Sequence, residues 1–273
     1  MPLKLMYITN RPAVAGIAES AGVDRIFVDM EYIGKEQRQS QMNTVKSTHT
    51  VSDVKNIASV IEKSELLVRV NPIYAGSRDE ISEVIDSGAD RIMLPMYKSI
   101  DEVEQFLRLT DGKVKTTLLA ETVQACEIME EVAGIAEVDE IHIGLNDLHL
   151  ALGKKFMFEL LADGTVEKIR EPIIKANKPF GFGGIARIGY GMVPAEYIIK
   201  EHYRLGSTAA ILSRCFGDVY KMDDLSEVEA LFDTEIKRIR LVEKEAEKMS
   251  KEQAEANRLE VIERVGRITG VNE

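Results

Sequence analysis

The chain has 273 residues, a length that can bury a large core as one α/β barrel or as two smaller domains. It has 35 basic and 46 acidic side chains and a formal net charge of −11. The acidic balance argues against a general nucleic-acid or anionic-membrane surface, but it does not exclude a small anionic substrate. Two cysteines without CxxC spacing indicate reduced thiols in a cytoplasmic protein, and neither a signal peptide nor a membrane span is expected.

Strand and helix signals alternate along the chain, which is typical of an α/β protein with parallel strands. Strands are predicted at Lys4–Thr9, Arg25–Glu31, Leu66–Pro72, Arg91–Met96, Lys115–Thr122, Glu140–Leu145, Pro179–Ala186 and Ala209–Phe216. Helical periodicity lies between them at Pro12–Ala21, Val51–Lys63, Ser77–Ser87, Ser99–Leu109, Val123–Ile135, Thr165–Ala176 and Pro194–Leu205. This alternation favours a closed TIM (β/α)8 barrel over an open sheet, although the glycines of the seventh predicted strand could equally mark a loop.

The chain changes character after the predicted barrel. Residues 1–222 are expected to form a TIM-barrel catalytic domain, and residues 223–273 a C-terminal helical extension. Apolar residues with helical spacing flank a strongly polar stretch in this extension, and an isolated polar helix is only marginally stable. The extension is therefore either a frayed tail or, as the better interpretation, a segment that docks on its own barrel or on a neighbouring subunit.

Two carboxylates follow neighbouring predicted strands, Glu121 after TTLLA and Asp147 after IHIGLN. In a parallel barrel the chemistry collects where the strands end, so both side chains would project from one rim. Hard divalent cations prefer oxygen ligands, and two carboxylates with open positions suit Mg²⁺ or Mn²⁺. Either acid alone could instead stabilise the N-terminus of the helix that follows it.

Side-chain alternation predicts which residues share a face of each strand. The inward sets would be Phe27, Asp29 and Glu31 on the second strand, Leu67, Arg69 and Asn71 on the third, and Thr117, Leu119 and Glu121 on the fifth. The charged members would then converge on the barrel mouth. Arg69 is costly to bury without an anionic partner, so it binds an anionic ligand, pairs with Glu31 or Glu121, or does both.

The histidines and a late arginine are weaker candidates. His142 is expected in the core or barrel wall, His149 on a helix or the rim, and His202 in a structural role. His49 follows the second strand, on the side of the barrel that carries the chemistry, or lies in a flexible surface loop. Arg214 ends the eighth predicted strand as a rim contact or a salt bridge.

Five segments, in the order GVDRIFVDMEY, LLVRVNP, GADRIMLPM, LLAET and HIGLNDL, resemble the HpcH/HpaI aldolase/citrate lyase family. The resemblance covers residues 4–216 and implies a TIM barrel of the phosphoenolpyruvate/pyruvate type and a homo-oligomer. It implies a divalent metal held by Glu121 and Asp147, and an oxo-acid or carboxylate contact for Arg69. The acidic positions of the family's second-strand motif correspond to Asp29 and Glu31. Further substrate contacts are expected from Asn146 and Pro95.

One position departs from the family pattern. Class II pyruvate aldolases of this family carry a proton-transferring histidine directly after the acidic pair, where this chain has Tyr32. A phenol loses its proton near pH ~10 and an imidazolium near ~6.5, so Tyr32 would need strong help from the metal or Arg69 to act as a base. We therefore predict that His49 serves as the base.

The predicted function is a metal-dependent, aldolase-type carbon–carbon lyase that acts on a 2-oxo acid such as pyruvate or oxaloacetate through an enolate. One alternative is a citryl- or malyl-CoA lyase-like enzyme, because citrate-lyase-like members share an RVNP-like third strand. Another is a catalytically silent barrel that binds a carboxylate. The three charged residues Glu121, Asp147 and Arg69 argue against the silent barrel, because a scaffold without a ligand has no physical need to hold three charges at one barrel mouth.

Overall fold

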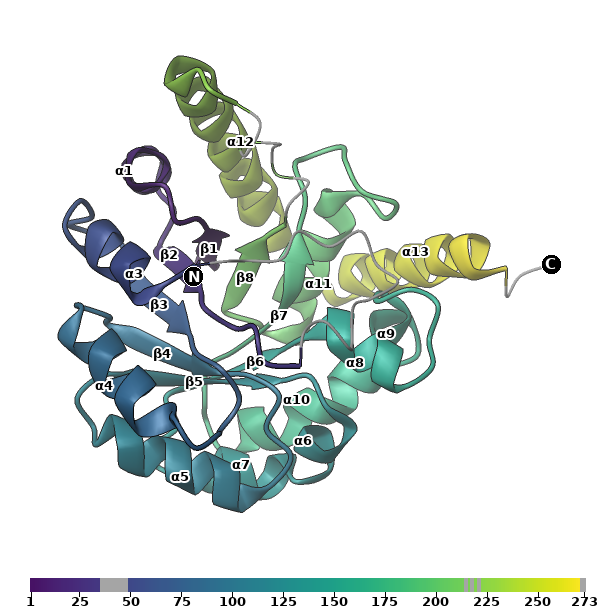
Figure 1. Ribbon diagram of the computed structural model, residues 1–273. Coiled ribbons are helices and arrows are strands. Elements are labelled where there is room, and N and C mark those ends of the chain that lie inside the picture. Colours follow the sequence, from purple (N-terminus) through teal and green to yellow (C-terminus); the bar gives the residue numbers. More distant parts are fainter. Residues whose placement is uncertain (35–48, 214–215, 217–218, 220–221, 271–273) are drawn as a thin grey trace.

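The computed structural model describes residues 1–34, 49–213, 216, 219 and 222–270. Its parallel strands close into a barrel in chain order, with β8 paired to β1 (Figure 1). The prediction of a TIM barrel is therefore confirmed. The strands are β1 Lys4–Ile8, β2 Arg25–Asp29, β3 Glu65–Arg69, β4 Arg91–Leu94, β5 Lys115–Ala120, β6 Glu140–Ile143, β7 Phe180–Ile185 and β8 Ala209–Leu212.

The glycine-rich segment around residue 181 is a strand, although its register against β8 shifts between Gly181 and Gly184. Gly183 lies within this irregularity and has a φ of +47°. A residue other than glycine would be strained there. The glycines thus mark a bulged strand rather than a loop.

The helices surround the barrel (Figure 1). They are α1 Pro12–Ser20, α3 Val51–Ala58, α4 Ser77–Asp86, α5 Ile100–Thr110, α6 Val123–Glu127, α7 Met129–Gly134, α8 Leu145–Ala151, α9 Glu159–Ala162, α10 Thr165–Lys175 and α11 Ala195–Leu205. The single helix predicted over 123–135 is two helices, because Ile128 between them has a φ of −96° and a ψ of 12°. The sequence also missed α8 and α9. Since α8 begins almost directly after β6, its first apolar residue looked like the end of the strand.

The buried apolar residues form two layers, one inside the barrel and one between the barrel and the surrounding helices. The inner layer consists of Met6, Phe27, Leu67, Met93, Leu119 and Ala209, and a much larger outer layer lies between strands and helices. Phe27, Leu67 and Leu119 are thus inward, as the alternation predicted. Residues two positions further along these strands project from the same face into the barrel mouth.

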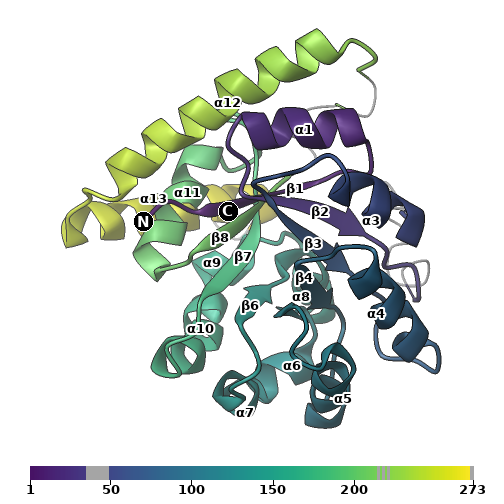
Figure 2. The same ribbon diagram turned by 90° about the vertical axis from the view of Figure 1, so that its left-hand side faces the viewer.

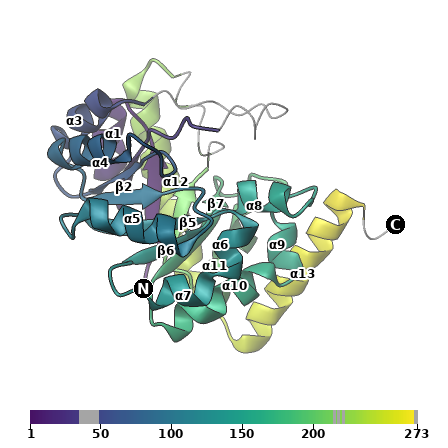
Figure 3. The ribbon, with the colours of Figure 1, turned by 60° about the horizontal axis from the view of Figure 1, so that its bottom comes forward.

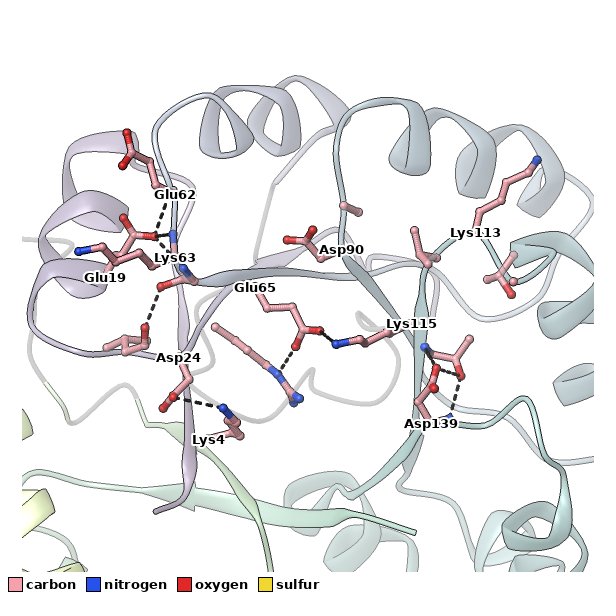
Figure 4. A pocket seen from close by; sticks show the side chains of 18 of the residues that line it. Lys4, Glu19, Asp24, Glu62, Lys63, Glu65, Asp90, Lys113, Lys115 and Asp139 are labelled. Atoms are coloured by element: carbon pink, nitrogen blue, oxygen red, sulfur yellow. Dashed lines mark hydrogen bonds and ion pairs between the residues drawn. The ribbon is translucent and has the colours of Figure 1, made fainter. Parts of the chain in front are cut away.

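The amino-terminal end of the barrel contains a hollow of about 1110 Å³ lined by charged side chains (Figure 4). Three aspartates at this end tie neighbouring strands together, because each accepts an N–H from the start of the preceding strand. The pairs are Asp24 with Leu5 at 2.9 Å, Asp90 with Leu66 at 2.7 Å, and Asp139 with Thr116 at 2.7 Å. The acids here bind backbone and neighbouring bases, which suits the stabilising role of this end of a TIM barrel.

The chain ends in two long helices, α12 Leu225–Ala246 and α13 Lys251–Thr269, that lie on the helical layer of the same chain. Helix α12 lies along α1 and α11 (Figure 2), and α13 lies against α11 and α9 (Figure 3). Two residues of the strongly polar stretch in the extension, Glu243 and Asn257, are buried at these contacts. The Glu243 carboxylate accepts the Leu3 N–H at 2.7 Å, and Asn257 donates to Glu201 at 2.8 Å.

These contacts hold the extension on its own barrel, while its division from the barrel at residue 222 and a role in oligomerisation stay predictions. Across the ranges given above, no helix has both the length and the apolar character needed to cross a lipid bilayer.

Candidate active site

Arg69 at the end of β3 lies between two carboxylates of the β2 end. Its Nε and Nη2 donate to Asp29 Oδ1 and Oδ2 at 2.8 and 2.9 Å, and its Nη1 lies 3.3 Å from Glu31 Oε2. Of the two structural partners predicted, Glu31 is present at this distance, but Asp29 makes the bidentate pair. Burial alone would lower the pKa of Arg69, but the charges of Asp29, Glu31 and Glu121 raise it. Arg69 therefore stays a cation and keeps N–H donors beyond those that Asp29 occupies.

Glu121 follows β5 and its side chain is fixed by two backbone neighbours. It is 3 % exposed, and its Oε1 accepts the N–H of Met96 at 3.2 Å. Met96 has a φ of +55°, an uncommon conformation for a residue with a side chain. A Cβ atom at Gly144 would lie 2.7 Å from Glu121 Cβ and 3.0 Å from Oε2. Only glycine lets the backbone after β6 approach the carboxylate so closely.

Asp147 lies in the first turn of α8, the helix whose N-cap is Gly144. Because Gly144 contacts Glu121, the two predicted metal-binding carboxylates are on adjacent elements. Their oxygen-only donor set fits Mg²⁺ or Mn²⁺. Within the described ranges, no group of three or more His, Cys, Asp and Glu side chains is arranged to hold a metal. Water or substrate oxygens would therefore complete the coordination of a cation bound by this pair, as is usual for Mg²⁺.

The charge of the mouth also favours a cation. The charges of three carboxylates, Asp29, Glu31 and Glu121, act on the one guanidinium of Arg69. Such an excess of negative charge over one base attracts a cation more strongly than an anion.

His49 contacts the backbone at the end of β2, and Tyr32 is exposed. The Asp29 backbone N–H donates to His49 Nδ1 at 3.0 Å. A backbone amide can only donate, so the neutral imidazole carries its proton on Nε2. The Tyr32 residue is 63 % exposed, although its backbone N–H donates to Asn71. The structure thus brings the His49 ring to the backbone of Asp29, whereas the Tyr32 side chain is largely exposed to solvent.

The other substrate candidates occupy the rim in different ways. Pro95 is buried directly after β4, and Asn146 is partly exposed in the first turn of α8, next to Asp147. Asn146 can therefore present its amide to a ligand, whereas Pro95 can offer only ring contacts and its carbonyl oxygen.

The remaining histidines are buried, which agrees with the core position expected for His142. His142 is buried inside the barrel with Nε2 3.2 Å from Gly183 O, and burial lowers its pKa to about 4. His149 in α8 contacts the Leu145 carbonyl oxygen through Nδ1 at 3.1 Å. His202 is buried in α11, with Nδ1 2.7 Å from Ser207 Oγ. Arg214 lies outside the described residues.

Sequence reasoning missed Met96 and Gly144 as residues that shape the site. Both act through backbone geometry, and neither carries a chemical group that a motif would single out. A glycine immediately after a predicted barrel strand was the one available signal for close backbone approach.

Comparison with known proteins adds a family match to this geometry. The model of the HpcH/HpaI aldolase/citrate lyase family matches residues 4–200. No curated protein matches the chain significantly.

Several solved structures share the fold at low sequence identity. An HpcH/HpaI aldolase from Desulfitobacterium hafniense DCB-2 has a TM-score of 0.63 and 16% identity, over 88% of this chain and 93% of that chain. The citrate lyase β subunit from M. tuberculosis, complexed with oxaloacetate and magnesium, has a TM-score of 0.59 and 14% identity, over 91% and 98%. Tryptophan synthase from M. tuberculosis in a ligand-free form also reaches 0.59, with 12% identity over 88% and 94%.

Since unrelated chemistries share this fold, the structural likeness establishes the fold alone. The family match is the more specific finding, because it runs from β1 into α11 and contains the proposed site residues from Asp29 to Asp147. On this ground the chain belongs to the HpcH/HpaI aldolase/citrate lyase family.

Proposed function

We propose that the protein is a divalent-metal-dependent carbon–carbon lyase that acts on a 2-oxo acid such as pyruvate or oxaloacetate through an enolate. The observation that carries this proposal is the convergence of the Arg69 guanidinium with Asp29, Glu31 and Glu121 at one barrel mouth. Family membership supports aldolase or citrate lyase chemistry. The oxaloacetate and magnesium in the M. tuberculosis citrate lyase β subunit support the choice of substrate class and metal.

Each residue has a distinct role in this proposal. Glu121 and Asp147 would hold Mg²⁺ or Mn²⁺, which when bound would supply Lewis acidity toward the substrate oxygens. Arg69 contributes a fixed donor where negative charge develops on the enolate oxygen. Asp29 holds the guanidinium plane through two hydrogen bonds. The Asn146 amide and Pro95 would complete the contacts to the substrate.

His49 is the group that we propose to move the proton. In the contact described above, Nδ1 accepts the Asp29 N–H and Nε2 carries the ring proton, so Nδ1 is the nitrogen with a lone pair. When the ring turns away from the Asp29 N–H, Nδ1 can take a proton from the substrate methyl group, and the imidazolium formed in this way returns a proton to the enolate carbon after carbon–carbon cleavage. Tyr32 would have to turn inward from its exposed position to do the same.

The function is tested by exchange of the pyruvate methyl protons with deuterium, which requires enolisation and no second substrate. We expect exchange that depends on added Mg²⁺ or Mn²⁺. Absence of exchange under all metal conditions would contradict the proposed function and favour a silent carboxylate-binding barrel.

The same assay distinguishes the two proton-transfer candidates. We expect His49→Gln to slow exchange by about 10²–10⁴-fold, the range for a general acid–base group, and Tyr32→Phe to have a smaller effect. The comparison uses rates at saturating pyruvate, together with thermal unfolding to confirm that both variants fold. If Tyr32→Phe is the more damaging change, or if His49→Gln has no effect, His49 does not transfer the proton.

Metal binding has its own test. Asp147→Asn keeps the size of the side chain but removes its charge, so we expect Mg²⁺ and Mn²⁺ binding measured by calorimetry to be lost or greatly weakened. Asp101→Asn is a matched control, because Asp101 also lies in the first turn of a helix that follows a barrel strand, α5 after β4, and is exposed. Unchanged affinity in folded Asp147→Asn would remove Asp147 from the metal site.

A further inference from the structure

The backbone that follows Glu31 is held by one buried side chain from the neighbouring strand end. Asn71 lies two residues after Arg69 and is 2 % exposed. Its Oδ1 accepts the backbone N–H groups of both Tyr32 and Ile33, each at 3.0 Å. One amide oxygen thus fixes two successive peptide groups next to a residue that contacts Arg69.

Glu80 of α4 fixes Asn71 in turn. Asn71 donates to Glu80 Oε1 twice, from Nδ2 at 2.7 Å and from its backbone N–H at 3.2 Å. The two ends of the Asn71 amide are therefore not interchangeable: the oxygen must face two backbone donors, and the nitrogen must face a carboxylate. Helix α4, Asn71 and the segment after β2 form one continuous chain of hydrogen bonds.

This arrangement is costly for stability alone. Glu80 is buried, and among the described residues its Oε2 has no hydrogen-bond partner. Burial raises the pKa of Glu80, while the two hydrogen bonds from Asn71 act in the opposite direction. An apolar residue would fill this helix position without leaving a buried polar atom unpaired.

We propose that Asn71 and Glu80 are positioning residues that fix the backbone after β2, so that the Glu31 carboxylate stays within reach of Arg69 Nη1. The contact that they protect is the 3.3 Å approach between Glu31 Oε2 and that nitrogen. The pair touches neither Asp29 nor Glu121 through any hydrogen bond described above. Its effect on the proposed enolisation would therefore pass through Glu31 and the orientation of Arg69. This inference rests on the proposed function.

The test compares a single variant, in which residues 71 and 80 both carry carboxyl groups, with a double variant, in which the amide and the carboxylate exchange places. Asn71→Asp keeps an oxygen for the Tyr32 and Ile33 amides but sets two carboxyl groups against each other. We expect the rate of methyl exchange at saturating pyruvate to fall by about 10–100-fold, the usual range for residues that orient a site from outside it. The double variant Asn71→Asp/Glu80→Gln restores a donor opposite the new carboxylate and keeps the original net charge. Most of the lost rate should return.

A second readout does not depend on catalysis. Backbone hydrogen exchange at Tyr32 and Ile33 should be slow in the original protein, faster in Asn71→Leu, which lacks the accepting oxygen, and unchanged in Glu83→Gln. Glu83 is the matched control because it lies on the same helix and is exposed.

The outcomes separate the two proposals. An original protein without methyl exchange contradicts the proposed function, and the hydrogen exchange then still tests the contact between Asn71 and the Tyr32–Ile33 backbone. An active protein whose rate is unaffected by Asn71→Asp overturns the positioning role. So does a folded double variant no faster than Asn71→Asp, or unchanged protection of Tyr32 and Ile33 in Asn71→Leu.

Discussion

Arg69→Lys is expected to lower the rate of metal-dependent methyl exchange by about 10²–10³-fold, the effect of losing one preorganised donor. The positive charge is retained, but the planar fork is lost. Arg69 reaches both oxygens of Asp29, at 2.8 and 2.9 Å, while Nη1 lies 3.3 Å from Glu31. A lysine ammonium is a compact point charge that cannot hold the same plane between these two acids.

The measurement is the turnover rate and the pyruvate KM of the Arg69→Lys protein, with thermal unfolding recorded in parallel. The control is Arg108→Lys, because Arg108 is an exposed arginine whose Nη1 pairs with Glu104 Oε2 at 3.3 Å. It should retain full activity. Equal turnover in Arg69→Lys and the original protein would leave Arg69 with a structural role only.

The second large effect is expected at the opposite end of the barrel, on stability. Glu140→Gln should lower the free energy of unfolding by about 3–5 kcal/mol, because it leaves a buried guanidinium without its main partner. Arg25 donates to both oxygens of Glu140, from Nη1 at 2.6 Å and from Nη2 at 2.9 Å. The same guanidinium contacts Glu65 through Nε at 2.5 Å, so one arginine connects β2, β3 and β6.

Urea unfolding at neutral pH provides the measurement. Glu137→Gln is the control, since Glu137 is an exposed glutamate shortly before the same strand, and its unfolding midpoint should not change. Equal midpoints for Glu140→Gln and the original protein would mean that the Arg25 pair adds nothing to stability.

The network also predicts how stability depends on pH. Burial alone would raise the pKa of Glu65, but the hydrogen bond and charge of Arg91, with the charges of Arg25 and Lys115, lower it to about 2 from its ordinary value of 4.5. A carboxylate with a depressed pKa in the folded state stabilises the protein above its unfolded pKa. The contribution from Glu65 should therefore be present above pH 4.5 and disappear as the pH falls toward 2.

Much of the architecture could be predicted from the sequence because it depends on local patterns. Alternation along a strand is a property of a few consecutive residues, so the inward direction of Phe27, Leu67 and Leu119 could be predicted without knowing their neighbours. The same parity placed Asp29 and Arg69 on the inner face, where they pair. Strand order followed from the alternation of strands and helices.

The tertiary structure alone decided which of these residues meet. Arg69 had three acids within plausible reach, and closure of the barrel paired it most closely with Asp29, through register between β2 and β3. His49 Nδ1 contacts the Asp29 amide although 20 positions separate the two residues in the sequence. A pattern of neighbouring residues cannot predict such a contact.

Backbone conformation and distant docking were likewise beyond the sequence. The left-handed conformation of Met96 is imposed on a residue that does not favour it, because its N–H is turned toward Glu121. Glu243 lies in a stretch that looks solvated by composition, yet it is buried against Leu3 at the other end of the chain. Local propensity is summed over neighbours in sequence, whereas burial and hydrogen bonding are settled between residues that are neighbours only in space. The sequence therefore determined the fold and the chemical groups of the mouth, and the folded chain decided their partners.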